Sequence, residues 1–122
     1  MSEILNDDCV NIRYFRDEVK KFVETRNWTK YHTPKNLVQA INCEAGELSQ
    51  LLLFEEYHKE DVIKDKEMIT KLSHEIADVF IYLISLINSL DLDLSQTFIE
   101  KMELNNIKYP IKEFNDGTYY KK

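Results

Sequence analysis

Apolar residues recur at helical spacing along most of the chain, and short polar stretches separate the periodic segments. The first segment runs from about Asn11 to Thr25 and predicts an amphipathic helix. The second opens at Thr33-Pro34, since Thr is a good N-cap residue and Pro suits the first helical turn. The helical pattern continues to about Glu56, so the second helix is expected to end there.

Two further helices are predicted in the second half of the chain. The third begins between Asp61 and Lys66 and ends near Leu90. The fourth begins after Asp93, the first residue of a capping box, and runs to about Lys108 before a proline stops it.

The composition agrees with a single helical domain of 122 residues. Two Gly and two Pro are too few for the many turns of an all-β sandwich or barrel. With 43% hydrophobic and 31% charged residues, the chain fits neither the disordered nor the membrane-spanning class. We therefore expect an all-α, four-helix bundle-like protomer, with residues 1–110 as one domain and residues 111–122 as a flexible tail.

The charge, the most apolar segment and the cysteines narrow the class of protein. A net charge of −6 argues against nucleic-acid binding, which needs a basic surface. The most apolar segment, Ile76 to Leu90, carries Asp78 and other polar residues, so it is a buried helix rather than a membrane span. Cys9 and Cys43 form no zinc-binding pattern, which favours two reduced thiols in a cytoplasmic protein.

The third predicted helix is more apolar than a protomer of this size can enclose. Apolar residues cover about half of its circumference, and a helix that is apolar on most sides is surrounded by other helices. We therefore expect a homodimer or a larger homo-oligomer, with this helix near the interface.

Two pairs of acids lie within the two most apolar helices, Glu44-x-x-Glu47 and Glu75-x-x-Asp78. Residues three apart on a helix differ by about 60° in azimuth and about 4.5 Å along the axis, so each pair can aim two carboxylates at one point. Most acids on helices are solvated, but the neighbours of Glu44 on its helical face are aliphatic. No Lys or Arg occurs in residues 36–56 or 72–100, so neither helix offers these acids its own partner. We therefore predict a divalent-cation site, with Mg²⁺ as the expected ion and Mn²⁺ as the alternative.

Aromatic residues near the second and third helices are candidate ligand contacts. Tyr82 lies one turn after Asp78, and its spacing fits substrate binding and simple packing equally well. Aromatic residues such as Trp28 and Phe54 are more often core than base-stacking platforms in helical proteins. Trp28 and His32 lie in a polar stretch, which favours ligand contact for these two residues.

Several motifs together resemble one known family. Glu44-Ala45-Gly46-Glu47 followed by Glu75-Ile76-Ala77-Asp78 is similar to the E-x-x-E…E-x-x-D signature of the MazG-like all-α nucleoside triphosphate pyrophosphohydrolases. The segment from Asn27 to Leu37 resembles the entry segment of the dCTP pyrophosphatase branch. Lys101 to Asn105, followed by Lys108-Tyr109-Pro110, resembles the last-helix motif of that branch. The resemblance covers about Phe15 to Pro110, most of the chain.

The resemblance implies roles for particular residues. In such a protein the four acids hold Mg²⁺ against the triphosphate, while Trp28, His32, Phe54 and Tyr82 shape the base and sugar pocket. Lys101 and Asn105 would reach the phosphates. Relatives that prefer cytosine nucleotides tend to carry Trp where this chain has Phe54, a departure that bears on base selectivity. Dimers or dimers of dimers are the assemblies that the resemblance implies, so a homodimer or homotetramer is expected.

The implied function is hydrolysis of (deoxy)nucleoside triphosphates between the α and β phosphates, which yields a nucleoside monophosphate and pyrophosphate. Pyrimidine nucleotides such as dCTP are the expected substrates, in a house-cleaning role in nucleotide metabolism. One alternative keeps the fold but changes the substrate, to phosphoribosyl-ATP or a damaged nucleotide. Another is a non-enzymatic helical module whose acids bind a structural cation or a basic partner.

Overall fold

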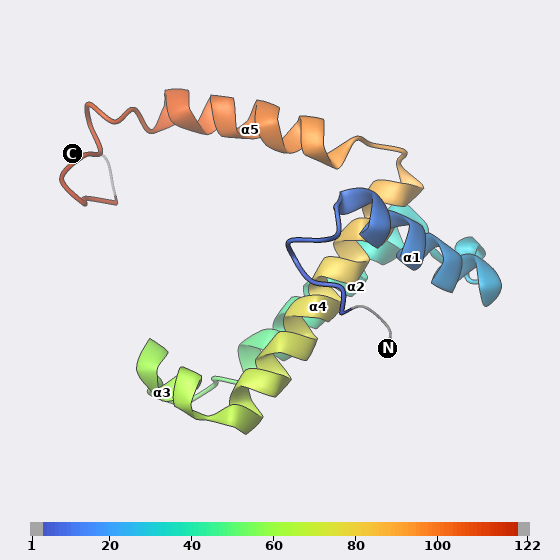
Figure 1. Cartoon of the computed structure of the whole chain (residues 1–122), viewed down its shortest axis with the longest axis horizontal. Helices are drawn as coiled ribbons and strands as arrows, with labels where there is room; N and C mark the ends of the chain where they lie inside the picture. The colour runs from blue at the N-terminus through green and yellow to red at the C-terminus, as the bar shows by residue number, and fades with distance from the viewer. Residues whose placement is uncertain (1–3, 120–122) are drawn as a thin grey trace. The chain divides into compact units, whose positions relative to one another are not determined.

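In the computed structural model, which describes residues 4–119, the chain is helical and contains no strand between those residues (Figure 1). The all-α fold class predicted from the sequence is therefore confirmed. The elements in chain order are α1 (Ile12–Thr25), the 3₁₀ helix η1 (Thr29–Tyr31), α2 (Pro34–Gln50), α3 (Lys59–Lys64), α4 (Lys66–Ser89) and α5 (Leu94–Lys108).

Side chains cap the start of each of the four long helices. Asn11 caps α1, Thr33 caps α2, Asp65 caps α4 and Asp93 caps α5. Each side-chain oxygen accepts a hydrogen bond from the backbone N–H three residues later, at 2.9 to 3.3 Å. These bonds satisfy donors that the first helical turn leaves unpaired. The helix starts predicted at Thr33-Pro34 and after Asp93 are confirmed.

The end of α2 and the segment after it differ from the expectation. α2 ends at Gln50 rather than near Glu56, because the next residues form turns in which an N–H bonds the carbonyl three residues earlier. Phe54 then adopts φ +63°, a left-handed conformation that does not continue a right-handed helix. The short helix α3 follows, and Asp65, with ψ of 96°, separates it from α4.

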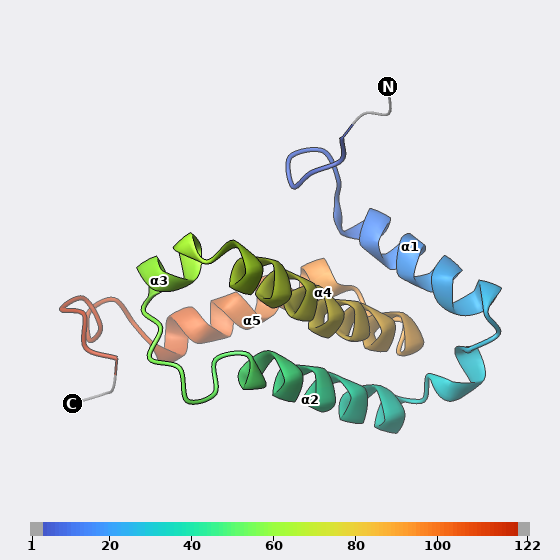
Figure 2. The ribbon, with the colours of Figure 1, turned by 90° about the horizontal axis from the view of Figure 1, so that it is seen from below.

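Packing of α2 against α4 builds the centre of the first part of the chain. The two helices run antiparallel and side by side in both views (Figure 2). Leu37 on α2 and Ile84 on α4 are the largest fully buried side chains, with 2% and 0% of their surface exposed. Removal of such apolar surface from water is the main force that holds the pair together.

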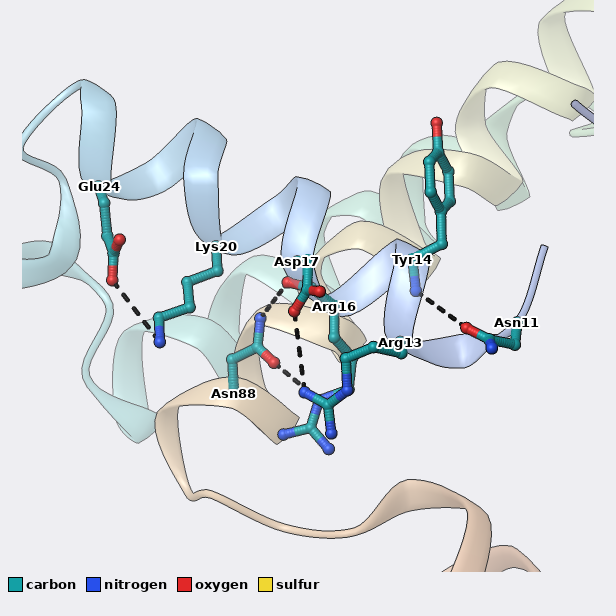
Figure 3. A network of polar contacts seen from close by, with 8 residues as sticks. All are labelled: Asn11, Arg13, Tyr14, Arg16, Asp17, Lys20, Glu24 and Asn88. Atoms are coloured by element: carbon teal, nitrogen blue, oxygen red, sulfur yellow. Dashed lines mark hydrogen bonds and ion pairs between the residues drawn. The ribbon is translucent and has the colours of Figure 1, made fainter. Parts of the chain in front are cut away.

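A polar clamp fixes α1 against the end of α4 (Figure 3). Arg16 on α1 donates from Nε to Oδ1 of Asn88 at 2.9 Å, and Asn88 returns a bond from Nδ2 to the carbonyl of Arg16 at 3.1 Å. Phe15 of α1 also meets Phe80 of α4 edge to face, with 5.4 Å between ring centroids. These contacts hold α1 along the side of α4 that carries Tyr82 and Ser85.

The chain divides into two compact units, one that ends at Asp91 and one that begins at Leu92. The second unit contains α5 and a turn in which the N–H of Phe114 donates to the carbonyl of Pro110. The single domain over residues 1–110 and the flexible tail over 111–122 remain predictions, and residues 120–122 lie outside the described part. Across residues 4–119, every helix is too short or too polar to cross a bilayer.

Candidate metal centre and adjacent cavity

The four acids singled out in the sequence lie on the two helices that pack together. α2 carries Glu44 and Glu47, and α4 carries Glu75 and Asp78. Glu44, Glu75 and Asp78 each offer a carboxylate oxygen, and these three atoms all lie within 4.8 Å of one another. The antiparallel pairing of α2 with α4 thus brings acids that are 31 or more residues apart in sequence to one point.

Repulsion and burial shape the electrostatics of this group. The pKa of Glu44 is raised to about 7, and burial is the largest cause. Hydrogen bonding to Glu47 and repulsion from Glu47 come next, followed by repulsion from Asp78 and Glu75. Burial also raises the pKa of Glu75, and repulsion from Glu47 and Asp78 adds to the increase. Glu47 therefore lies close enough to interact with both residues, although it is not one of the three converging acids.

The orphaned oxygens of the group fit a cation. Oε2 of Glu44 and Oε2 of Glu75 are buried and have no hydrogen-bond partner among the described residues. The three ion pairs described between residues 4 and 119 lie on α1 and at the start of α4, and none includes one of these acids. Buried acceptors without partners are costly, whereas Mg²⁺ and Mn²⁺ bind several oxygen ligands. The donor set and its burial therefore suit a hard divalent cation.

The raised pKa of Glu44 predicts how the stability of the metal-free protein depends on pH. The folded state binds the Glu44 proton more tightly than the unfolded state, so this contribution is fully present below pH 4.5. It is lost as the pH rises towards about 7, and Glu75 acts in the same direction. We expect the free energy of unfolding to fall by about 1 to 2 kcal/mol from Glu44, a value reduced for solvent screening. Urea denaturation in a chelator at pH 5 and pH 8 measures it.

The Glu44→Gln variant isolates this effect from other titrations. Burial lowers the pKa of His32, so His32 contributes with the opposite sign and destabilises the fold as the pH falls. The difference between wild type and Glu44→Gln cancels the His32 contribution. An equal pH dependence in the two proteins would show that Glu44 carries no raised pKa.

A cavity of about 380 Å³ lies between α1, the η1 segment and α4. Trp28, His32 and Tyr82, three of the predicted ligand contacts, line it together. Most of the remaining wall is apolar. Its volume falls within the usual range of small-molecule pockets. Tyr82 lies one turn beyond Asp78 on α4, so the cavity wall and the acid group share that helix.

The turn after α1 places Trp28 and His32 at the cavity. Asn27 adopts φ +56°, a conformation that Asn tolerates better than most residues, and this reverses the chain after α1. The N–H of Trp28 donates to the carbonyl of Val23 at 3.0 Å. The Trp28 ring packs against Phe22 with 5.8 Å between centroids. Ser89 of α4 donates to the carbonyl of His32 at 3.2 Å and so ties the segment to α4.

Three other predicted contacts are Phe54, Lys101 and Asn105. Phe54 is 96% exposed in the turn after α2 and lines neither of the two cavities described in the first unit. Lys101 and Asn105 lie on α5, in the second unit, where a separation of four residues places them on one face of the helix. Their roles remain proposals.

Sequence reasoning missed the contribution of α1 to this cavity. Phe15, Glu18 and Phe22 line it, although the sequence predicted only that this helix is amphipathic. The available signal was Glu18, an acid one turn before Phe22 on the same face of α1. Whether Glu18 faces a cavity depends on which helix packs against α1, and the residue spacing within α1 does not predict that helix.

Comparisons with known proteins agree on one kind of relative. No family model matches the chain. The chain is 34% identical over 93 residues to dCTP pyrophosphatase 1 from Mus musculus, which covers 75% of this chain and 54% of that protein. The identity to dCTP pyrophosphatase 1 from Homo sapiens is 32% over 92 residues, with 74% and 54% covered. The chain thus spans about half the length of these curated relatives.

A solved structure resembles the chain over nearly its whole length. The crystal structure of a pyrophosphatase from Archaeoglobus fulgidus DSM 4304 superposes with a TM-score of 0.74 at 30% identity. The match covers 90% of this chain and 99% of that one.

Proposed function

The chain belongs to the MazG-like all-α family of nucleoside triphosphate pyrophosphohydrolases, and from this premise we propose that it hydrolyses (deoxy)nucleoside triphosphates between the α and β phosphates. The products are a nucleoside monophosphate and pyrophosphate. The observation that carries the proposal is the convergence of Glu44, Glu75 and Asp78, two of which have buried oxygens without partners. Pyrimidine nucleotides such as dCTP are the proposed substrates, in a house-cleaning role in the nucleotide pool.

The acids are proposed to hold Mg²⁺ and to position the triphosphate. Glu44, Glu75 and Asp78 provide the converging oxygens, and Glu47 adds a fourth carboxylate beside them. When bound, such an ion lowers the pKa of water and neutralises charge that develops on the leaving pyrophosphate. One of the carboxylates takes the proton of the attacking water as general base.

The cavity is proposed to hold the nucleoside. Trp28 and Tyr82 offer ring surfaces on which a base can stack. Such stacking depends little on which base is bound. Because burial lowers the pKa of His32, its imidazole is neutral near pH 7 and can donate or accept a hydrogen bond. Lys101 and Asn105 are proposed to reach the phosphates, and Phe54 to contact the base or sugar once substrate is bound.

A panel of nucleotides tests this function. The chain is incubated with each of the common (deoxy)nucleoside triphosphates and Mg²⁺, and the release of pyrophosphate and of orthophosphate is measured separately. We expect pyrophosphate with a nucleoside monophosphate, and loss of turnover when a chelator is added. Orthophosphate with a nucleoside diphosphate would contradict α–β cleavage. Complete absence of turnover, with Mg²⁺ still bound, would favour a non-enzymatic module.

We further propose that the chain assembles as a homodimer or homotetramer. Apolar side chains of α2 and α4 remain exposed after the two helices pack, among them Val38 at 54% and Ile76 at 56%. Water-exposed apolar surface of this extent favours association with a further copy. Light scattering at micromolar concentration should give a mass of at least twice the 14.6 kDa of the chain. A monomeric mass would contradict the proposal.

A cytoplasmic location is also proposed. Cys9 and Cys43 are both free and exposed, and free thiols persist in a reducing compartment. Cell fractionation checks this location, and recovery in an oxidising compartment would contradict it.

A further inference from the structure

One acidic side chain lines the largely apolar cavity beside Trp28. Among the described residues that form its wall, Glu18 of α1 is the one carboxylate, and no lysine or arginine lines it. Glu18 takes part in none of the ion pairs described between residues 4 and 119. The metal-centre acids are not part of this wall, so the proposed catalytic function leaves Glu18 without a role.

Ser85 adds a further acceptor to the wall. Ser85 of α4 is 4% exposed, and its hydroxyl donates to the carbonyl of Ile81 at 3.0 Å. Because its one hydrogen is committed to that carbonyl, the oxygen of Ser85 has only lone pairs left for a ligand. The α1 side and the α4 side of the cavity thus each contribute an acceptor.

The carboxylate of Glu18, the one acid among the described residues of the wall, favours a particular edge of a nucleobase. Cytosine and adenine carry an exocyclic amino group, which donates hydrogen bonds. Uracil and thymine carry a carbonyl oxygen at the same place on the ring. A carboxylate binds the amino group by a charge-assisted hydrogen bond, whereas it repels the carbonyl oxygen.

Resting on the proposed function, we propose that Glu18 is a specificity-determining residue, which makes the cavity prefer nucleobases with an exocyclic amino group over their carbonyl counterparts. The carboxylate of Glu18 accepts a hydrogen bond from the amino group. The apolar and aromatic walls stack on the ring without distinguishing one base from another. Selectivity between an amino and a carbonyl group on the base is therefore assigned to Glu18, the one acid among the described residues of the wall.

The dCTP and dUTP pair tests Glu18 directly, because the two bases differ in the amino and carbonyl groups. In wild type we expect kcat/KM for dCTP to exceed that for dUTP by about tenfold or more, the size of one charge-assisted hydrogen bond. Glu18→Gln removes the charge and adds an amide that can donate to a carbonyl. This variant should shift the ratio by about tenfold towards dUTP.

A matched control is available on the same helix. Glu24→Gln makes the same chemical change in α1, where Glu24, exposed like Glu18, pairs with Lys20 (Figure 3) and does not line this cavity. It should leave the ratio of dCTP to dUTP unchanged. An equal shift in both variants would attribute the effect to net charge and overturn the role of Glu18.

A binding measurement separates this inference from the proposed catalysis. Trp28 is the one tryptophan in the chain and lines the cavity, so its fluorescence reports occupancy. Titration with dCMP and dUMP should show tighter binding of dCMP by wild type and loss of that preference in Glu18→Gln. If no triphosphate is hydrolysed but this preference is present, the catalytic proposal fails and the inference stands. Equal binding of dCMP and dUMP by wild type, or no binding of either, would overturn the inference.

Discussion

Replacing Glu44 with glutamine is expected to lower the rate of pyrophosphate release by about 100- to 1000-fold, the range seen when one preorganised group that stabilises transition-state charge is lost. Glu44 contributes one of three oxygens that lie within 4.8 Å of one another, so the variant loses a charged ligand at the centre of the group. Asp78→Asn, on the opposite helix, should cause a loss of similar size. The measurement is the initial rate of pyrophosphate release with dCTP and saturating Mg²⁺.

The same variants should keep the helical fold. Because burial and neighbouring acids raise the pKa of Glu44, a neutral side chain at this position relieves repulsion in the metal-free protein. Glu44→Gln should therefore melt no lower than wild type at pH 8 in a chelator, and circular dichroism should be unchanged. Glu67→Gln is the matched control, since Glu67 is an exposed acid on α4 that pairs with Lys71. Full turnover by Glu44→Gln would remove Glu44 from the mechanism.

Ile84→Ala is expected to reduce the free energy of unfolding by about 3 kcal/mol, the middle of the range for truncation of a fully buried isoleucine. Ile84 lies in the C-terminal third of α4 and is 0% exposed. The truncated side chain leaves a void that the surrounding helices fill only in part. Urea denaturation measures the loss, with both proteins at one concentration because oligomer stability depends on it.

Ile63→Ala is the control for this core variant. Ile63 lies on α3 and is 58% exposed, so the same truncation removes little buried surface. Its expected cost is within about 0.5 kcal/mol, as for most surface substitutions. A loss below about 1 kcal/mol in Ile84→Ala would mean that the surroundings of Ile84 are not packed as described.

Local chemistry explains why the helix starts were predictable. Thr33 and Asp93 cap their helices through bonds to the N–H three residues later, so the signal lies within one turn of chain. The end of α2 was not predictable in the same way. Apolar residues continue past Gln50, but the chain leaves the helical path there and Phe54 takes a left-handed conformation. This end is decided by the return of the chain, which brings α4 back to pack against α2. No residue near Gln50 is a typical signal for the end of a helix.

In the candidate site too, the arrangement within one helix was predictable and the arrangement between helices was not. Helical geometry put Glu44 and Glu47 on one side of their helix, and Glu75 and Asp78 on one side of theirs, from spacing alone. The pairing of α2 with α4 decided which oxygens converge, and it placed Glu47 beside the group rather than within it. Spacing along one helix says nothing about the register of the helix opposite.

The sequence by itself determined the all-α class, most helix starts and the two acid pairs, because capping and helical periodicity act between residues at most four apart. Tertiary structure alone decided the cavity, the place of Glu18 in it and the separation of Phe54 from it. The cavity depends on contacts between α1 and α4 such as Arg16 with Asn88, which are 72 residues apart. Side-chain packing between distant segments selects such contacts, and no local pattern in the chain encodes them.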